Sequence, residues 1–293
     1  MAAFANRHIN TADGVKLHYR DYAGPADLPP ILCLPGLTRN SRDFDGVADR
    51  LAGQWRVIAP DFRGRGGSQY DPDPANYRPA VYVADMLKLL DQLGIADAVF
   101  FGTSLGGIVT MVLAHGDEER VAGALINDIG PEVDQRGIDR IRSYVGQPQQ
   151  WDSWTAAANA FAAAHGPAFP RWQAADWDRF ARRTCREDKT SQIVLDYDMA
   201  IAQPFSQANE GIQPNLWPLL SGLKDRPVTI LRGATSDLFS AQVADRMVSE
   251  LGAQAELVTI PQVGHAPSLE EPESIAAIDR LLARVKARVA AEV

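Results

Sequence analysis

Hydrophobic residues along the chain fall into two kinds of cluster. Short, unbroken apolar runs, such as 30–35 and 98–101, are typical of strands that are buried on both faces. Longer segments between them, such as 77–94 and 241–251, carry apolar residues at the three-to-four-residue spacing of a helix packed along one face. The pattern predicts an α/β fold in which right-handed βαβ units build a mostly parallel sheet covered by helices.

The same reading places the remaining elements along the chain. The dipeptide Asp13-Gly14 lies between two alternating segments, which predicts a hairpin with a tight turn. The expected strands are 4–10, 15–22, 30–35, 56–60, 98–101, 121–126, 228–231 and 255–260, and the expected helices are 44–51, 77–94, 105–115, 241–251 and 272–289.

The alternation breaks between 131 and 218. This segment holds five of the six tryptophans, an alanine-rich helical stretch at 155–165 and several prolines. We therefore expect a helical cap, 131–218, inserted after the sixth strand of a core domain made of 1–130 and 219–293. The basic stretch 171–186 is interleaved with aspartates, which is typical of the solvated face of a helix rather than of an anion site.

Composition narrows the classes of partner. The chain has 293 residues and a formal net charge of −8, so we expect no general attraction to nucleic acid or to an anionic membrane. The start lacks the apolar core of a signal peptide, and two cysteines do not make a disulfide framework. We expect a soluble cytoplasmic protein with a small-molecule substrate, and a homodimer is the one protein assembly that we keep open.

Ser104 is the first candidate for chemistry. It is the central residue of Gly102-Thr103-Ser104-Leu105-Gly106, directly after a predicted strand and at the start of a predicted helix. A G-x-S-x-G sequence in that context predicts a strained turn that presents a nucleophilic hydroxyl at the carboxyl end of the sheet.

A nucleophilic serine needs a base and an orienting carboxylate. His265 follows the last predicted strand, and Asp237 follows the preceding one, so both are expected at the edge that carries Ser104. Asp128 ends at the same edge and is the alternative acid, although we favour Asp237 and expect Asp128 to stabilise the turn into the insertion. The other histidines are expected to be surface or packing residues: His8, His18, His115 and His165.

Donors for an oxyanion are expected from two loops. The backbone N–H of Leu105 opens the helix after the serine, and the N–H of Leu37 follows Gly36, which permits close approach of the backbone. The chemistry predicted for these groups requires no metal and no organic cofactor.

With these positions in hand, the sequence resembles the α/β-hydrolase superfamily over essentially its whole length. The resemblance is carried by 34–37, 61–68, 102–106, Arg232-Gly233 with Asp237, and Gly264-His265. It is strongest to the cap-bearing branch of esterases, enol-lactonases and carbon–carbon bond hydrolases. Pro35-Gly36 stands where the family usually has His-Gly, and a serine rather than an aspartate at 104 argues against dehalogenases and epoxide hydrolases.

The sequence thus predicts a serine hydrolase that cleaves a carboxylic ester or lactone of a small, mostly apolar substrate through an acyl-enzyme on Ser104. The alternative is hydrolysis of a carbon–carbon bond in a ring-fission diketone, which uses the same three residues. A ligand receptor without catalysis and a cofactor-free perhydrolase or lyase on the same scaffold are further alternatives.

Overall fold

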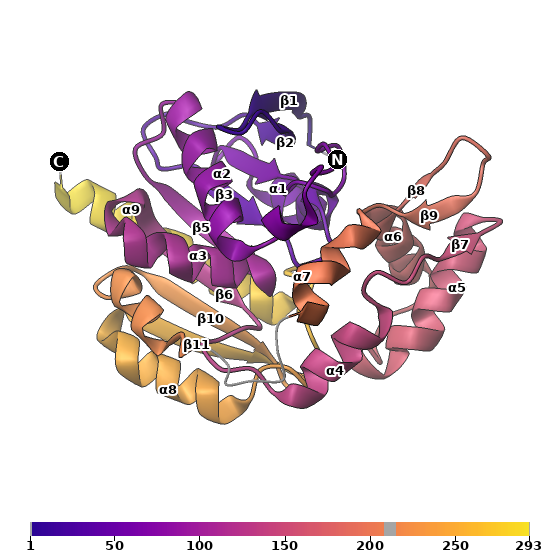
Figure 1. Ribbon diagram of the computed structural model, residues 1–293. Coiled ribbons are helices and arrows are strands. Elements are labelled where there is room, and N and C mark those ends of the chain that lie inside the picture. The colour runs from indigo at the N-terminus through magenta and orange to yellow at the C-terminus, as the bar shows by residue number, and fades with distance from the viewer. Residues whose placement is uncertain (1, 208–214, 293) are drawn as a thin grey trace.

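An eight-stranded sheet runs through the centre of the computed structural model, which describes residues 2–207 and 215–292 (Figure 1). The order across the sheet is β1-β2-β4-β3-β5-β6-β10-β11. β2 is antiparallel to both of its neighbours, and every other neighbouring pair is parallel. The strands are β1 (Ala5–Asn10), β2 (Lys16–Tyr22), β3 (Ile31–Leu34), β4 (Val57–Pro60), β5 (Ala98–Thr103), β6 (Val121–Asn127), β10 (Val228–Gly233) and β11 (Ala255–Ile260). The predicted mostly parallel sheet is confirmed.

Helices cover both faces of this sheet. The side chains of β3 point alternately to the two faces, and both faces are buried, so its sequence is uniformly apolar. Leu32 and Leu34 pack into the core on the side of α2, α3 and α8, whereas Ile31 and Cys33 pack into the core on the side of α1 and α9. All four side chains are fully buried. The helices are α1 (Asp45–Leu51), α2 (Pro79–Gln92), α3 (Leu105–Gly116), α8 (Ala241–Leu251) and α9 (Pro272–Glu292).

The N-terminal hairpin forms with the register Ala5↔Asp21 through Asn10↔Lys16, as the alternating pattern predicts. Its turn is wider than the tight one expected. The N–H of Thr11 donates to the carbonyl of Val15 at 2.9 Å, and of the Asp13-Gly14 pair only Gly14 adopts a positive φ, of 85°.

The segment between β6 and β10 contains α4 (Gln135–Tyr144), α5 (Trp154–His165), α6 (Ala174–Thr184) and α7 (Ala202–Gln207). It also contains a three-stranded antiparallel sheet of β7 (Gln150–Trp151), β9 (Ile193–Leu195) and β8 (Cys185–Glu187), so the expectation of a purely helical insertion is corrected. Strands of two or three residues are too short to show a two-residue alternation in sequence.

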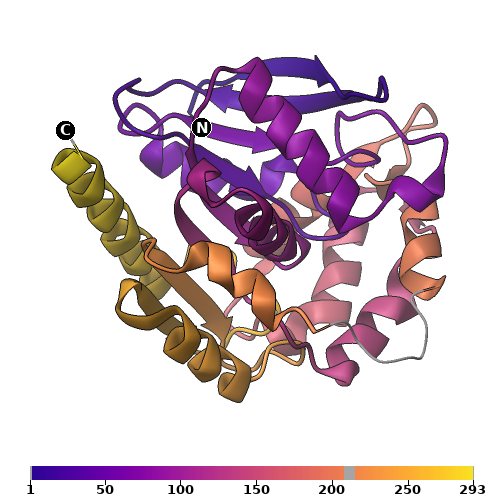
Figure 2. The ribbon, with the colours of Figure 1, turned by 60° about the vertical axis from the view of Figure 1, so that its left-hand side comes forward.

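The insertion gathers on one side of the sheet (Figure 1), and Figure 2 shows the C-terminal end of α9 on the other side of the molecule. Across the described residues, no helix has both the length and the apolarity needed to cross a membrane.

Candidate active site

Ser104 lies in a sharp turn between β5 and α3, with φ 51° and ψ −115°. A positive φ is strained for a residue that carries a side chain, and the surrounding packing maintains it. A Cβ on Gly106 would stand 2.1 Å from the carbonyl oxygen of Leu34, and one on Gly102 would stand 2.5 Å from the carbonyl oxygen of Gly106. Only glycine fits at both positions, which explains the spacing of the motif.

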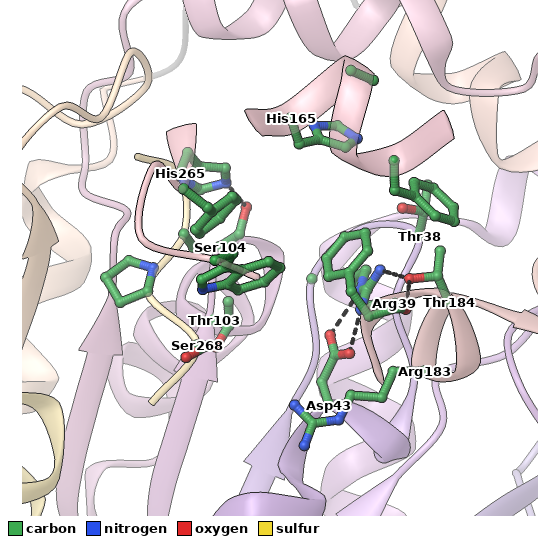
Figure 3. Close-up of a pocket in the computed structure, with 18 of the residues that line it drawn as sticks. Thr38, Arg39, Asp43, Thr103, Ser104, His165, Arg183, Thr184, His265 and Ser268 are labelled. Atoms are coloured by element: carbon green, nitrogen blue, oxygen red, sulfur yellow. Dashed lines mark hydrogen bonds and ion pairs between the residues drawn. The ribbon is translucent and has the colours of Figure 1, made fainter. Parts of the chain in front are cut away.

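A hydrogen-bonded series of three side chains starts at this turn. Ser104 Oγ lies 3.0 Å from Nε2 of His265, and Nδ1 of His265 lies 2.8 Å from Oδ2 of Asp128 (Figure 3 shows Ser104 beside His265). A carboxylate only accepts hydrogen bonds, so Nδ1 carries the proton and Nε2 is left to accept from the serine hydroxyl. The Asp128 side chain is fully buried, and that of His265 is 10% exposed. This is the geometry of an activated nucleophile.

The structure corrects the choice between the two carboxylates. Asp237, the favoured acid, forms a two-pronged ion pair with Arg140 of α4, with Oδ2–Nε and Oδ1–Nη2 distances of 2.5 and 2.8 Å. Hydrogen bonding from Arg140 lowers the pKa of Asp237. Asp128, the alternative acid, instead faces His265. The N–H of Asp128 bonds the carbonyl of Leu231, and its φ of 56° turns the chain out of β6 at the sheet edge.

The loop after β10 still contributes to the site, through groups that the sequence analysis missed. Gly233 N–H donates to Oδ1 of Asp128, and the hydroxyl of Ser236 donates to Oδ2, each at 2.7 Å. The amide of Asn127 donates to Thr103 Oγ1 at 3.1 Å and to the carbonyl of Pro267 at 2.9 Å. Asn127 therefore ties the end of β6 to the serine turn and to the loop of the histidine. The available signal was a polar residue at the end of β6, Asn127, and another in the loop after β10, Ser236.

The Gly36–Leu37 turn lies beside the serine, since a Cβ on Gly36 would stand 3.8 Å from the Cβ of Ser104. The carbonyl of Leu37 accepts a hydrogen bond from Nε of Arg65 at 2.9 Å, which fixes this turn to the loop after β4. Within the described residues, the backbone N–H groups of Leu37 and Leu105 have no hydrogen-bond partner. Two unpaired backbone donors thus remain, one in the turn of Ser104 and one in the turn of Gly36.

A cavity of about 650 Å³ separates this edge of the sheet from the insertion. Ser104 and His265 lie on one side of it, and Arg39 and Thr184 lie on the other (Figure 3). The part of its wall that comes from the insertion includes a set of aromatic side chains: Tyr144, Phe161, Phe169, Trp172, Phe180 and Tyr197.

The arginines of the cavity wall are mostly paired with acids. The pairs are Arg39–Asp43, Arg140–Asp237, Arg179–Asp176 and Arg183–Glu270, with closest N–O distances of 2.5, 2.5, 2.5 and 2.6 Å. Two of these arginines, Arg140 and Arg183, thereby connect the insertion to the rest of the chain instead of pointing into solvent. Because the charges largely cancel, the wall carries little net attraction for an anion.

Residues that could hold a metal do not gather in the described ranges, where no group of three or more His, Cys, Asp or Glu side chains has suitable geometry. Cys33 and Cys185 are buried free thiols. Burial raises the pKa of Cys185 to about 12, so its thiol is protonated and unreactive at neutral pH.

Comparison with known proteins gives the following matches. Residues 31–278 match the Alpha/beta hydrolase family. A crystal structure of an alpha/beta hydrolase from Novosphingobium aromaticivorans is 49% identical and superposes with a TM-score of 0.92, covering 97% of this chain and 99% of that one. A 3-hydroxybutyrate-oligomer hydrolase of Cupriavidus necator is 32% identical over 275 residues, which is 92% of this chain and 93% of that protein. A 2-(acetamidomethylene)succinate hydrolase of Mesorhizobium japonicum is 26% identical over 84% of each chain.

Proposed function

The chain belongs to the alpha/beta hydrolase family, and from this premise we propose that it is a serine hydrolase that cleaves carboxylic esters or lactones through an acyl-enzyme on Ser104. The observation that carries the proposal is the hydrogen-bonded series from Asp128 through His265 to Ser104, at the wall of a cavity. Residues 131–218 are the proposed cap of the two-part arrangement, with 1–130 and 219–293 as the core.

In the proposed reaction, Nε2 of His265 takes the proton of Ser104 as Oγ attacks the acyl carbon. Asp128 holds the Nδ1–H tautomer and stabilises the imidazolium that forms. Its own position is held by the N–H of Gly233 and the hydroxyl of Ser236. Because these donors satisfy the carboxylate oxygens away from solvent, Asp128 keeps a fixed orientation without a neighbouring cation.

The tetrahedral intermediate places negative charge on the former carbonyl oxygen. The N–H groups of Leu37 and Leu105 are the proposed donors to this oxygen, and each donor of this kind contributes about 2.7–4 kcal/mol of barrier lowering. His265 then protonates the leaving group, and in the second half of the reaction it activates the water that releases the acyl group from Ser104.

The side chains that line the cavity indicate the polarity and charge of the substrate. Aromatic side chains from the insertion favour a mostly apolar acyl or alcohol part. The paired arginines favour an uncharged substrate in the part of the cavity that they line. The Cupriavidus relative acts, by its name, on oligomers of 3-hydroxybutyrate, and hydroxy acids are joined in such oligomers through ester bonds. This supports an ester as the bond that is cleaved.

The experiment that tests the proposal measures initial rates on p-nitrophenyl esters of increasing acyl length, with wild type beside Ser104→Ala. We expect turnover by the wild type with one preferred acyl length, and its loss in the variant. A dienoate diketone is included as a further substrate. Turnover of that diketone together with no turnover of any ester would contradict the proposal.

The acid is tested by a matched pair of variants, Asp128→Asn and Asp237→Asn. The asparagine at 128 cannot hold the productive histidine tautomer, so kcat on the preferred ester should fall about 10⁴-fold. The asparagine at 237 removes an ion pair to α4 and should change kcat little. A larger loss of kcat in Asp237→Asn than in Asp128→Asn would contradict this assignment and identify Asp237 as the acid.

A further inference from the structure

His165 is the last residue of α5, and its imidazole lies in the part of the cavity wall that comes from the insertion (Figure 3). Three aromatic rings surround it, with centroids 6.1 Å away for Tyr144, 6.2 Å for Phe161 and 6.0 Å for Phe180. The imidazole therefore sits among aromatic rings at the wall of the same cavity as the nucleophile.

The turn after His165 is joined directly to the loop of the proposed base. Gly264, the residue before His265, donates its N–H to the carbonyl of Ala168 at 2.7 Å. A Cβ on Gly264 would stand 2.7 Å from the Cβ of Ala168, so the two backbones are in close contact. This contact fixes the end of α5 relative to the loop of His265, and a substrate held by His165 would have a defined position toward Ser104.

The ring nitrogens of His165 have no hydrogen-bond partner among the described residues. Burial, with the nearby guanidinium groups of Arg140 and Arg39, lowers the pKa of His165 to about 4. The imidazole is therefore neutral at physiological pH and presents one N–H donor and one nitrogen lone pair. The ring nitrogens are not among the fully buried unpaired polar atoms of the described residues, and His165 lines the cavity, so a molecule bound in the cavity can reach them.

Two structural roles fit His165 less well. A histidine at a helix C-terminus stabilises the helix dipole as a cation, but this imidazole is neutral. A ring that only filled the space between Tyr144, Phe161 and Phe180 would need no nitrogen atoms, and phenylalanine would serve equally.

The chemistry of the partner follows from the same observations. A carboxylate would add a negative charge beside arginines that are already paired with acids, and it would use only the N–H of the ring. A hydroxyl group adds no charge, is compatible with the aromatic surroundings, and can bond to either nitrogen as donor or acceptor.

We propose that His165 is a specificity-determining residue that forms a hydrogen bond with an uncharged hydroxyl group of the substrate. The preferred substrates are then esters in which the acyl or the alcohol part carries a free hydroxyl. This inference rests on the proposed ester hydrolysis and identifies the substrate class of the same site.

The test compares kcat/KM within two matched pairs of esters. One pair is methyl 3-hydroxybutanoate against methyl butanoate, and the other is the monobutanoate of propane-1,3-diol against propyl butanoate. In at least one pair, the wild type should have a kcat/KM about tenfold higher on the hydroxylated ester. In His165→Phe, the ratio of the two kcat/KM values should fall to about one. His165→Gln, which keeps a donor and an acceptor, should retain part of it.

His115 provides the matched control, because it is an exposed histidine near the end of α3 that contacts Ser221 and does not line the cavity. His115→Phe should leave both preferences unchanged. A wild type that cleaves both members of each pair equally well, or a preference that survives in His165→Phe, would overturn the inference and leave the proposed ester hydrolysis intact. No Ser104-dependent turnover of any ester would instead contradict the proposed function, and the inference with it.

Discussion

Burial of His165 couples its protonation to folding. Its pKa in the folded protein is about 4, against an ordinary value of 6.5, because desolvation and the nearby Arg140 and Arg39 disfavour the imidazolium. Between these two values the unfolded chain binds more protons than the folded one. Acidification from pH 7 to pH 4 should therefore lower the free energy of unfolding, with the loss beginning near pH 6.5 and complete below about pH 4.

The measurement is urea unfolding of wild type and His165→Phe at several values between pH 7 and pH 4. Other groups titrate in both proteins, so the difference between the two unfolding free energies isolates His165. The wild type should lose stability relative to the variant as the pH falls. A difference that stays constant over this range would mean that the folded imidazole is not held neutral.

At the residue scale, the sequence predicted that Ser104 and His265 meet at one edge of the sheet, and the two side chains are 3.0 Å apart; it did not predict which carboxylate joins them. Ser104 stands in a motif that defines its own turn, and His265 is the only histidine that follows a strand of the C-terminal half. Asp128 and Asp237 both follow neighbouring strands, β6 and β10, so sequence order does not separate them. The hydrogen bond from His265 to Asp128 and the ion pair from Arg140 to Asp237 distinguish them, and both join residues distant in sequence.

The turn between β5 and α3 depends on a contact between backbones that a single methyl group would break. Gly106→Ala would place a Cβ 2.1 Å from the carbonyl oxygen of Leu34, where only backbone movement can relieve the clash. Overpacking of this kind costs about 1–3 kcal/mol. We expect a lower free energy of unfolding, together with loss of ester hydrolysis because Ser104 moves relative to Leu37.

Gly116 offers the control on the same helix. A Cβ there would meet nothing within 4 Å, and the residue ends α3. Gly116→Ala should leave activity unchanged and stability unchanged or higher by up to about 1 kcal/mol. Equal behaviour of the two variants in urea unfolding and in ester hydrolysis would show that close packing at Gly106 does not hold the turn.

The elements of the core were predictable because its central strands are unbroken apolar runs and its helices are long enough to show the helical spacing of apolar residues. α8 and β11 have the predicted bounds, and β5 extends the predicted strand by two residues. The three strands of the insertion were not predictable, because they are held by pairing between β7, β8 and β9 from separate parts of the segment.

For the whole molecule, the arrangement of the insertion over the sheet edge depends on two separate sets of polar contacts. Arg42 donates to the carbonyls of Arg183 and Cys185 and to the carboxylate of Asp196. Arg140 of α4 pairs with Asp237. These contacts hold both α4 and the segment from α6 to Asp196 against the core, so the insertion should set the size of substrate that reaches the serine.

The limit on substrate size can be tested by substitutions in α5. Ala160 lines the cavity, whereas Ala163 on the same helix is exposed and does not. Ala160→Phe should shift the preferred acyl length toward shorter esters and lower kcat/KM on the longest accepted ester about tenfold, since overpacking costs about 1–3 kcal/mol and 1.4 kcal/mol is a factor of ten. Ala163→Phe should reproduce the wild-type profile because its ring extends into solvent. If both variants keep the wild-type acyl-length profile, α5 does not bound the acyl group, and the size limit must come from the loops of the sheet edge instead.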